Sequence, residues 1–599
     1  MNSEINTVRS FWIPEKAKIV IILSVVGFFA SQKLYFKILY QINFPQGMDF
    51  FNGINYVFTY VKTGVFPFGE FITPISGHIH IFPRLVALPN LLFNSFDVAN
   101  LFYLHWGLES IALFLIFLLL KRTSSKFYWL LIPISAFIYS PLQDSNFWSF
   151  SIIMWLLPPV AIIGIIYLLN KNLNLKFLSA AVGLAVVSTF SITIGIVAWL
   201  VGIVGLIKFD EHHKKLIEKK FLSIWIACTV ITGLIFYSQW PTDTNQPNLA
   251  FLFTIDGFYF LTTFISSAFR LKYHFLMVLV GSFSLILGSF SVYYFTVVKK
   301  NLKIAFPWIL FLVVGVGGAL ITDIGRGDLP LHYGNEPYYI PISQFFQIGL
   351  LVLISLIMID LRKTPSHMRK KILFYFLLAV IIAHMVLLIP SYYTGWSRGD
   401  HYFQIKTDYV NCFSLSPKLD CLEPTTEVNM GMGEDTTHPM INYWIENKLS
   451  IFGDTKFNKK NLEHVSYFEE TWNKNDKTLL GMGNIELINE ATTNEKTTIY
   501  LDDQLVVISG WMLDEEGKQL DSTYLLVNDK PFIQFDDFQP RKDVIEKFGD
   551  NMELYSGWEI FFMSGYLENN CQTISIAGLK DDKNIRLNQE IKLCKSNMD

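Results

Sequence analysis

The residues of this chain best suited to chemistry lie in a loop between its first two long apolar segments. Asp49 follows the first segment by about ten residues, and the cluster GHIHIFPRL, residues 77–85, holds His80 and Arg84 four positions apart. A carboxylate at such a boundary can accept a proton from a hydroxyl group or hold a divalent cation, and a guanidinium binds phosphate oxygens in a fork. Asp49 is therefore a candidate base, and His80 with Arg84 a candidate phosphate site. A solvated carboxylate and an arginine that extends to lipid head groups are the plain alternatives.

A second cluster with similar residue types follows a later apolar segment. The stretch TDIGRGDLPLHYGNEPYY, residues 322–339, carries Asp323, Arg326, Asp328 and His332 among glycines. Glycines let the backbone approach a ligand, and an arginine between two aspartates can engage a phosphate and sugar hydroxyls together. We expect these four residues to bind substrate, with an internal salt-bridge loop as the alternative.

A third cluster, SPLQDSNFWSF at residues 140–150, offers amide and aromatic groups. Such groups hydrogen-bond and stack on sugar rings, so Gln143 and Asn146 are further candidates for substrate binding. Lys33 and Lys37 lie one helical turn apart near the end of the first apolar segment. They are placed to meet a lipid phosphate, although long lysine side chains more often extend to the membrane surface.

The composition is typical of a polytopic membrane protein. Of the 599 residues, 51% are hydrophobic, 16% aromatic and only 17% charged, which is more apolar surface than one soluble core can bury. A net charge of -3 argues against a nucleic-acid partner, because binding a polyanion requires a concentrated basic face. Five cysteines without a CxxC pair signal neither a zinc site nor a redox centre, so we assign no metal ligands and leave a divalent cation open as a cofactor.

The elements that must position these clusters are membrane-spanning helices. The run 177–207 is interrupted by the polar residues between Ser188 and Gly195, which predicts two short helices that enter and leave on the same side. With these two, we expect an all-α bundle of eleven crossings. The other nine apolar runs lie at about 17–38, 100–120, 127–140, 151–169, 222–238, 274–297, 304–321, 339–359 and 372–390.

The distribution of basic residues predicts the orientation of this bundle. The N-terminal tail and the connections on its side carry 20 Lys and Arg, whereas the longer facing connections carry 5. Because basic connections stay in the cytoplasm, the N-terminus is expected inside and everything after Pro390 outside. The first span lacks a small-residue cleavage site and is expected to be retained as an anchor.

The sequence after Pro390 predicts an extracytoplasmic soluble part. We expect a transmembrane domain at 1–390, a linker region at 391–482 and an antiparallel β-sandwich at 483–599, where β-branched residues alternate with polar ones. Cys412 with Cys421, and Cys571 with Cys594, are two candidate disulfides in an oxidising exterior. Trp511 and Trp558 are open to two interpretations, as sugar-binding surfaces or as core residues.

Several short motifs in fixed order resemble a known family. GHIHIFPRLVALP after a first-loop aspartate, FIYSPLQDSNFWSF, STFSITIGIVAWL, GRG followed by PYYIPISQFFQIGLL, and CLEP past the last span are similar to bacterial polytopic proteins with the GT-C glycosyltransferase architecture. Further along, ISGWMLDEEGK, QPRKDV and YSGWEIFF resemble the β-sandwich appended to many of them. The resemblance extends over nearly the whole chain and rests on the order of its motifs.

The resemblance implies an inverting glycosyltransferase of the bacterial cytoplasmic membrane. Such enzymes move a sugar from a polyprenyl-phosphate carrier to a cell-surface glycan or lipid-linked acceptor on the outer face, with a first-loop acid as base, a position that Asp49 occupies. The chain departs from the expected pattern at Ser145, where an acid precedes the asparagine in the family, and at Pro337, where the family has an arginine before the tyrosine. Arg326 or Arg84 would have to take over the phosphate role of that arginine.

Two other classes of function fit a polytopic chain. A flippase or other transporter of lipid-linked sugars should carry polar or charged residues within its spans. A non-catalytic partner in glycan assembly or polymerisation would share the loops without requiring Asp49. Convergence of Asp49, Arg84 and Arg326 on one cavity would favour the enzyme.

Overall fold

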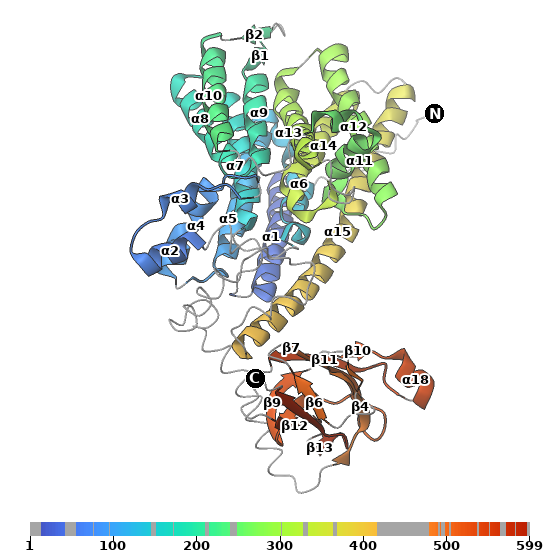
Figure 1. Cartoon of the computed structure of the whole chain (residues 1–599). Coiled ribbons are helices and arrows are strands. Elements are labelled where there is room, and N and C mark those ends of the chain that lie inside the picture. Colours follow the sequence, from blue (N-terminus) through green and yellow to red (C-terminus); the bar gives the residue numbers. More distant parts are fainter. Residues whose placement is uncertain are drawn as a thin grey trace, which may run out of the picture. The chain divides into compact units, whose positions relative to one another are not determined.

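The computed structural model contains two compact units, residues 1–404 and 405–599 (Figure 1). The first is helical and the second is built mainly of β-strands. The described residues are 14–41, 43, 55–75, 77–94, 96–144, 151–171, 173–209, 215–217, 219–239, 248–300, 302–326, 334–362, 368–415, 479–488, 491–492, 498–501, 505–535, 538–549, 552–563, 571–581 and 583–595.

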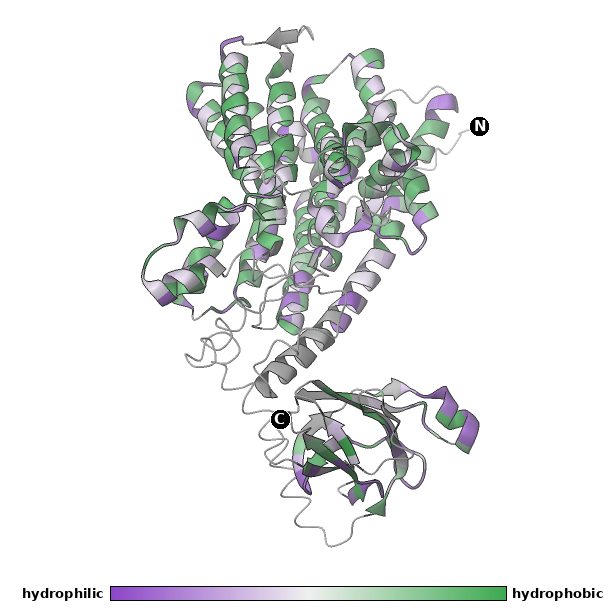
Figure 2. Ribbon diagram, in the orientation of Figure 1, coloured by the Kyte–Doolittle hydropathy of each residue, from purple (hydrophilic) through white to green (hydrophobic). Residues whose placement is uncertain are grey.

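Eight helices of the described chain are long and apolar enough to cross a membrane. They are α1 (Glu15–Tyr40), α5 (Leu101–Thr123), α7 (Ser151–Leu169), α10 (Lys219–Ser238), α12 (His274–Tyr293) with η7 (Tyr294–Val298), α13 (Leu302–Arg326), α14 (Ile340–Arg362) with the preceding turn η9 (Pro337–Tyr339), and α15 (Met368–Leu415). Figure 2 shows hydrophobic residues along most of the length of these helices. The chain is therefore a multi-pass membrane protein by the length and composition of its helices.

Shorter elements occupy the remaining described parts of the helical unit. They are α2 (Asn55–Thr63), α3 (Phe68–Ile72), α4 (Ile81–Phe93), η2 (Ser125–Leu130), α6 (Leu131–Ile138), η3 (Pro141–Asp144), α8 (Leu175–Thr189), η4 (Thr193–Ile196), α9 (Val197–Gly205), the hairpin β1 (Ile207–Phe209) and β2 (Lys215–Ile217), η5 (Leu249–Phe253), α11 (Ile255–Ser266) and η6 (Ser267–Phe269). The run 127–140, expected as a span, is divided between η2 and α6, each too short to cross a bilayer alone.

The expected interruption of the run 177–207 is confirmed. Helix α8 ends at Thr189, and η4 begins at Thr193 and leads into α9. At this turn the two segments approach so closely that a Cβ on Gly195 would lie 1.9 Å from the carbonyl oxygen of Ser188. Only glycine fits such an approach, and the Ser188 hydroxyl donates to the Gly195 carbonyl at 2.9 Å.

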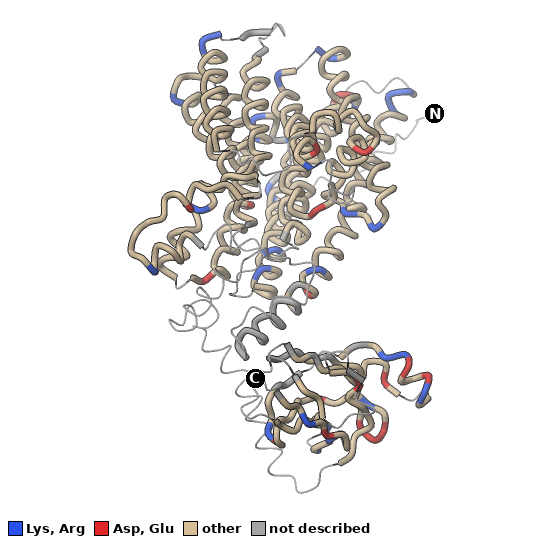
Figure 3. Tube along the Cα trace, viewed as in Figure 1, with Lys and Arg blue, Asp and Glu red and all other residues tan. Residues whose placement is uncertain are grey.

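One hydrophobic core joins most of the long helices. It contains residues of α5, α7, α8, α9, α13, α14 and α15, and the pairs α13 with α14 and α7 with α8 make the most extensive contacts between helices. Figure 3 shows Lys and Arg on several helix ends beside the β1–β2 hairpin. These helix ends belong to the connections that the sequence predicts on the cytoplasmic side.

The second unit contains two sheets among its described residues. The five-stranded sheet has the order β10-β11-β7-β4-β5 and the seven-stranded sheet contains the path β3-β13-β12-β14-β6, with β8 between β12 and β9. The elements are β3 (Leu479–Leu480), β4 (Met482–Ile488), β5 (Ala491–Thr492), β6 (Thr498–Leu501), β7 (Leu505–Leu513), β8 (Ser522–Val527), β9 (Lys530–Phe535), β10 (Gln539–Pro540), α18 (Lys542–Phe548), β11 (Tyr555–Met563), β12 (Cys571–Lys580), β13 (Lys583–Arg586) and β14 (Ile591–Lys595).

Two pairings in the second sheet differ from the antiparallel arrangement expected. Strand β3 pairs with β13 and β6 pairs with β14, both in parallel. Along the chain β3 is followed by β4, and β6 lies between β5 and β7, so the sequence neighbours of both parallel strands belong to the five-stranded sheet. A single core contains residues of both sheets, including Ile508 of β7 and Ile576 of β12.

The core of the second unit distinguishes between the two interpretations of Trp511 and Trp558, as sugar-binding surfaces or as core residues. Trp558 lies in the common core and Trp511 in a small cluster with Leu513 and Val544, and both are buried. The core interpretation is therefore the one that the structure supports. Cys571 lies directly opposite Cys594 on neighbouring strands, and the two form a disulfide, as expected.

The end of helix α15 differs from the domain boundary expected at Pro390. It continues through this proline to Leu415, so residues 391–404 belong to the helical unit. Cys421, the expected partner of Cys412, lies outside the described residues.

Candidate functional site

The loop before α4 lies against the break between α8 and η4. The Thr193 hydroxyl donates to the carbonyl of Gly77 at 2.9 Å, and Nδ1 of His78 lies 2.6 Å from the same hydroxyl oxygen. Nδ1 of His80 lies 2.7 Å from the carbonyl oxygen of Ser191. Hydrogen bonds thus join two segments that lie more than a hundred residues apart in the sequence.

Burial favours the neutral form of both histidines of this loop. Burial lowers the pKa of His80 to about 3. Burial, followed by the charges of His80 and Arg326, holds the pKa of His78 well below its usual range. A neutral imidazole does not attract a phosphate by charge, so His80 brings no positive charge to the phosphate site expected with Arg84.

The guanidinium of Arg84 binds the backbone of its own loop. Only 1% of the residue is exposed, and Nη1 donates to the carbonyl oxygens of Glu70 at 3.1 Å, of Thr73 at 3.2 Å and of Phe71. These carbonyls belong to the end of α3, where helical carbonyls lack intrahelical partners. Arg84 therefore stabilises the turn after α3, and it neither extends to lipid head groups nor presents an open fork to a phosphate.

The end of α13 positions two other candidates differently. Asp323 is 1% exposed, and neither of its oxygens has a hydrogen-bond partner among the described residues. Arg326 is partly exposed and lies near enough to His78 and Tyr338 to interact with both electrostatically. Within the described part of the chain, no hydrogen bond or ion pair engages Arg326, so Asp323 does not pair with it.

An aromatic cluster lies next to Arg326. The ring of Trp155, at the start of α7, is 5.0 Å from that of Tyr338 and 5.4 Å from that of Tyr339. The indole Nε1 of Trp155 is buried, and no described residue accepts its hydrogen bond. Turn η3 packs against turn η9, which brings the second and third sequence clusters together.

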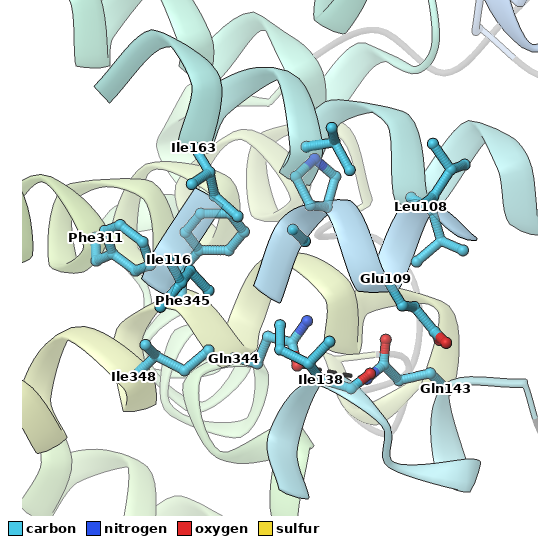
Figure 4. A pocket seen from close by; sticks show the side chains of 14 residues that line it. Leu108, Glu109, Ile116, Ile138, Gln143, Ile163, Phe311, Gln344, Phe345 and Ile348 are labelled. Atoms are coloured by element: carbon cyan, nitrogen blue, oxygen red, sulfur yellow. Dashed lines mark hydrogen bonds between the residues drawn. The ribbon is translucent and has the colours of Figure 1, made fainter. Parts of the chain in front are cut away.

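Gln143, from the third cluster, points into the bundle. Its Nε2 donates to the carbonyl oxygens of Phe137 at 2.8 Å and Ile138 at 3.0 Å, and lies 3.4 Å from Oε1 of Gln344. The carboxylate of Glu109 and the two amides lie around a cavity of about 10 Å³ (Figure 4). This volume suits about one water molecule and excludes a sugar.

A buried ion pair lies beside this cavity. Nζ of Lys33 is 3.3 Å from Oε1 of Glu109 and donates to the carbonyl of Ser140 at 2.8 Å. Lys37 is also buried, with Nζ 5.8 Å from the centre of the Phe102 ring. The expectation that these two lysines extend to the membrane surface is wrong, because they face α5 inside the bundle.

The sequence analysis missed Glu109, although a signal was present. Glu109 stands in the middle of the apolar run 100–120, and an ionisable residue within a span is costly unless it has a partner or a role. Its four-residue spacing from His105 adds to that signal. The identity of its partner, Lys33, depends on the packing of α1 against α5.

The structure thus brings some sequence candidates together and separates others. Arg326 lies within electrostatic reach of His78 and of Tyr338 in η9, whereas Arg84 binds the turn after α3 and Gln143 points into the bundle. Among the described residues there is no group of three or more His, Cys, Asp or Glu suited to a metal ion. Four candidates lie outside the described residues, namely Asp49, Asn146, Asp328 and His332.

Comparisons with protein-family models, curated proteins and solved structures find no match to this chain.

Proposed function

We propose that this chain is an integral-membrane glycosyltransferase of the bacterial cytoplasmic membrane. It would move a sugar from a polyprenyl-phosphate carrier to a cell-surface glycan or lipid-linked acceptor on the outer face. The observation that carries this proposal is Arg326. This partly exposed cation lies at the end of a membrane-length helix and forms no ion pair with any described residue. The reaction class comes from the family resemblance of the sequence motifs.

The surroundings of Arg326 suit a sugar phosphate. A guanidinium presents several donors in a fixed plane, which matches the oxygens of a phosphate. Trp155 and Tyr338, with ring centres 5.0 Å apart, are of the types that stack on sugar rings. An anionic carrier that bears a sugar would therefore satisfy both features.

The proposed reaction requires a base near the attacking hydroxyl. The acceptor oxygen attacks the anomeric carbon, the bond from that carbon to the phosphate oxygen breaks, and the polyprenyl phosphate leaves with the electron pair. Asp49 is proposed to take the hydroxyl proton, and Arg326 to stabilise the charge of the departing phosphate. Inversion at the anomeric carbon follows from a single displacement.

The proposed topology combines the eight long helices with the shorter apolar ones. Segments η2 with α6, α8, and η4 with α9 would complete the eleven crossings expected from the sequence. The distribution of 20 basic residues against 5 supports a cytoplasmic N-terminus and an outer position for the end of α13. The second unit would then be extracytoplasmic, which suits the disulfide Cys571–Cys594.

Replacement of Asp49 by Asn tests the proposal. The variant keeps the shape of the side chain but loses most of its basicity, so we expect transfer to fall by about 10²–10⁴-fold. The assay measures the sugar modification of the surface glycan in a strain that lacks its own copy, with membrane abundance followed in parallel. Glu70→Gln is the matched control, since Glu70 is an exposed acid of the same loop. Full modification by a normally abundant Asp49→Asn protein would remove the enzyme assignment.

One observation favours transport of a lipid-linked sugar as the second candidate. The pair Lys33–Glu109 lies inside the bundle, and intramembrane charges of this kind mark transport pathways in many proteins. A transporter would tolerate Asp49→Asn but would lose movement of the carrier across proteoliposome membranes when the buried pair is changed. An enzyme with a structural pair would show the opposite dependence on Asp49.

A further inference from the structure

The hydrogen bonds of His78 determine which of its nitrogens carries the proton. The Thr193 hydroxyl has one hydrogen, which it donates to the Gly77 carbonyl at 2.9 Å. Its oxygen must therefore accept a hydrogen bond from Nδ1 of His78, 2.6 Å away. In a neutral imidazole the other nitrogen then carries a lone pair. Nε2 of His78 is a fixed hydrogen-bond acceptor.

The neighbouring histidine has the same tautomer but a different exposure. Nδ1 of His80 faces the carbonyl oxygen of Ser191 at 2.7 Å, so this nitrogen also carries the proton. His80 is fully buried, and its Nε2 has no hydrogen-bond partner among the described residues. His78 is partly exposed. Of the two, only His78 can meet a ligand without movement of the loop.

Arg326 lies at the end of α13, which packs against η4, the turn that carries Thr193. Its guanidinium interacts electrostatically with His78, and no described residue forms a hydrogen bond or an ion pair with it. A ligand at this place meets five N–H donors and one lone pair. A bare anion satisfies the arginine but repels the lone pair of Nε2, whereas a ligand that also carries a hydroxyl satisfies both.

We propose that His78 and Arg326 together recognise a phosphate ester that bears a free hydroxyl close to the phosphate. Arg326 binds the phosphate oxygens, and Nε2 of His78 accepts a hydrogen bond from the hydroxyl. This inference deepens the proposed function and rests on it, because a glycosyl phosphate is such a ligand. The glycerol head group of phosphatidylglycerol has the same chemistry and is the other source to be distinguished.

The test uses the full chain in phosphatidylcholine nanodiscs, which offer a phosphate ester without a hydroxyl. Affinities are measured for four added lipids: polyprenyl-phosphate glucose, polyprenyl-phosphate galactose, sugar-free polyprenyl phosphate and phosphatidylglycerol. In the unchanged protein, at least one hydroxyl-bearing lipid should bind about 3- to 10-fold more tightly than sugar-free polyprenyl phosphate, as one additional hydrogen bond allows. This comparison depends on no variant.

Two substitutions of His78 separate recognition from a structural role. His78→Asn keeps a donor at the place of Nδ1 and loses the acceptor, whereas His78→Gln keeps an acceptor at the place of Nε2. We expect His78→Asn to lose the preference for hydroxyl-bearing lipids and His78→Gln to retain most of it. The same two changes at His80 are the matched control, and there the preference should not depend on which amide is present.

Each result decides the inference. Equal affinity of the unchanged protein for lipids with and without hydroxyls, or absence of binding, would overturn it. Binding of the sugar carriers with the same preference in His78→Asn and His78→Gln would also overturn it, while the proposed function would stand. A preference for phosphatidylglycerol alone, lost in His78→Asn, would support the recognition pair and count against the glycosyl carrier.

Discussion

Each of the two compact units contains an ion pair, and the two pairs differ in burial. In the helical unit the side chains of Lys33 and Glu109 are 0% and 1% exposed. In the second unit Arg541 binds Glu486 through two hydrogen bonds of 2.9 Å, with the side chains 21% and 33% exposed. Bulk water screens the second pair, whereas the first is buried away from bulk water.

The contrast between the two pairs shows in which unit an unpaired charge is an indication of function. Within the helical bundle a buried charge must be compensated, as Lys33 is by Glu109 and the Ser140 carbonyl. A partly exposed Arg326 beside buried aromatic residues is therefore informative. In the second unit a charged side chain at the surface has water as its partner, so such residues indicate little about function.

Loss of one partner of the buried pair should have the largest effect. Glu109→Ala leaves the ammonium of Lys33 inside the bundle without its carboxylate, and breaking such a pair costs about 3–5 kcal/mol. We expect a large drop in the yield of folded protein and in resistance to thermal unfolding in detergent. Unchanged thermal unfolding of Glu109→Ala would show that water reaches the pair.

The double variant Lys33→Met with Glu109→Leu is the matched control. Replacing both charges by apolar side chains removes the desolvation cost together with the attraction, so stability should return to near that of the unchanged protein. If the double variant is stable but inactive in sugar transfer or carrier movement, the pair has a functional role beyond packing.

Arg326→Ala should weaken ligand use without weakening the fold. A hydrogen bond between charged groups contributes about 1.5–3 kcal/mol, and Arg326 has no described partner to lose. The measurement is the dependence of transfer on the concentration of the lipid-linked donor, with thermal unfolding recorded alongside. If Arg326→Ala is less stable but depends on the donor concentration as the unchanged protein does, Arg326 has a structural role, as Lys33 does.

Arg541→Ala should have a small effect by comparison. The pair with Glu486 is partly exposed, and pairs of this kind contribute about 0–1 kcal/mol. Hydrogen exchange of amides in β4, β11 and α18 measures the local stability. A cost as large as that of Glu109→Ala would contradict the contrast between the two units.

Acid should affect the second unit only slightly. The hydrogen bond from Arg541 lowers the pKa of Asp543, and the backbone N–H of Asp581, followed by Lys580, lowers that of Asp521. A lowered folded-state pKa contributes stability above the unfolded value of about 3.9, and this contribution is lost as the pH falls through the folded value. We expect lower protection factors, which compare the exchange rate with the intrinsic rate at the same pH, for amides of β12 and α18 below about pH 4. The loss of protection should be smaller in the double variant Asp521→Asn with Asp543→Asn. Protection factors that rise on acidification would reverse the sign.

The sequence predicts the fold where local pattern decides it. Apolar length identifies the long helices, and the polar residues from Ser188 to Gly195 predict the break before η4. The strand pattern and the two cysteines predict the disulfide Cys571–Cys594. The parallel pairs of β3 and β6 could not be predicted, because they depend on how the chain passes between the sheets.

Less of the candidate site than of the fold could be predicted from the sequence. Arg84 and Arg326 have the same side chain, and only the fold shows that one holds the end of α3 while the other lies open beside Tyr338. His78 and His80 differ in exposure and in hydrogen-bond partner, and the partners Thr193 and Ser191 lie more than a hundred residues away. Lys33 and Glu109 find each other through helix packing, which no local pattern encodes.

The short hairpin of α8 and α9 has a consequence for the surrounding bilayer. A helix of 15 residues is about 22 Å long, whereas the hydrocarbon layer is about 30 Å thick. If α8 crosses the bilayer, as proposed, the lipid beside it must thin or the loop of Gly77 to His80 must fill the missing depth. Hydrophobic mismatch would then couple this loop to membrane thickness, and lipids with longer acyl chains would strain the loop even without a ligand.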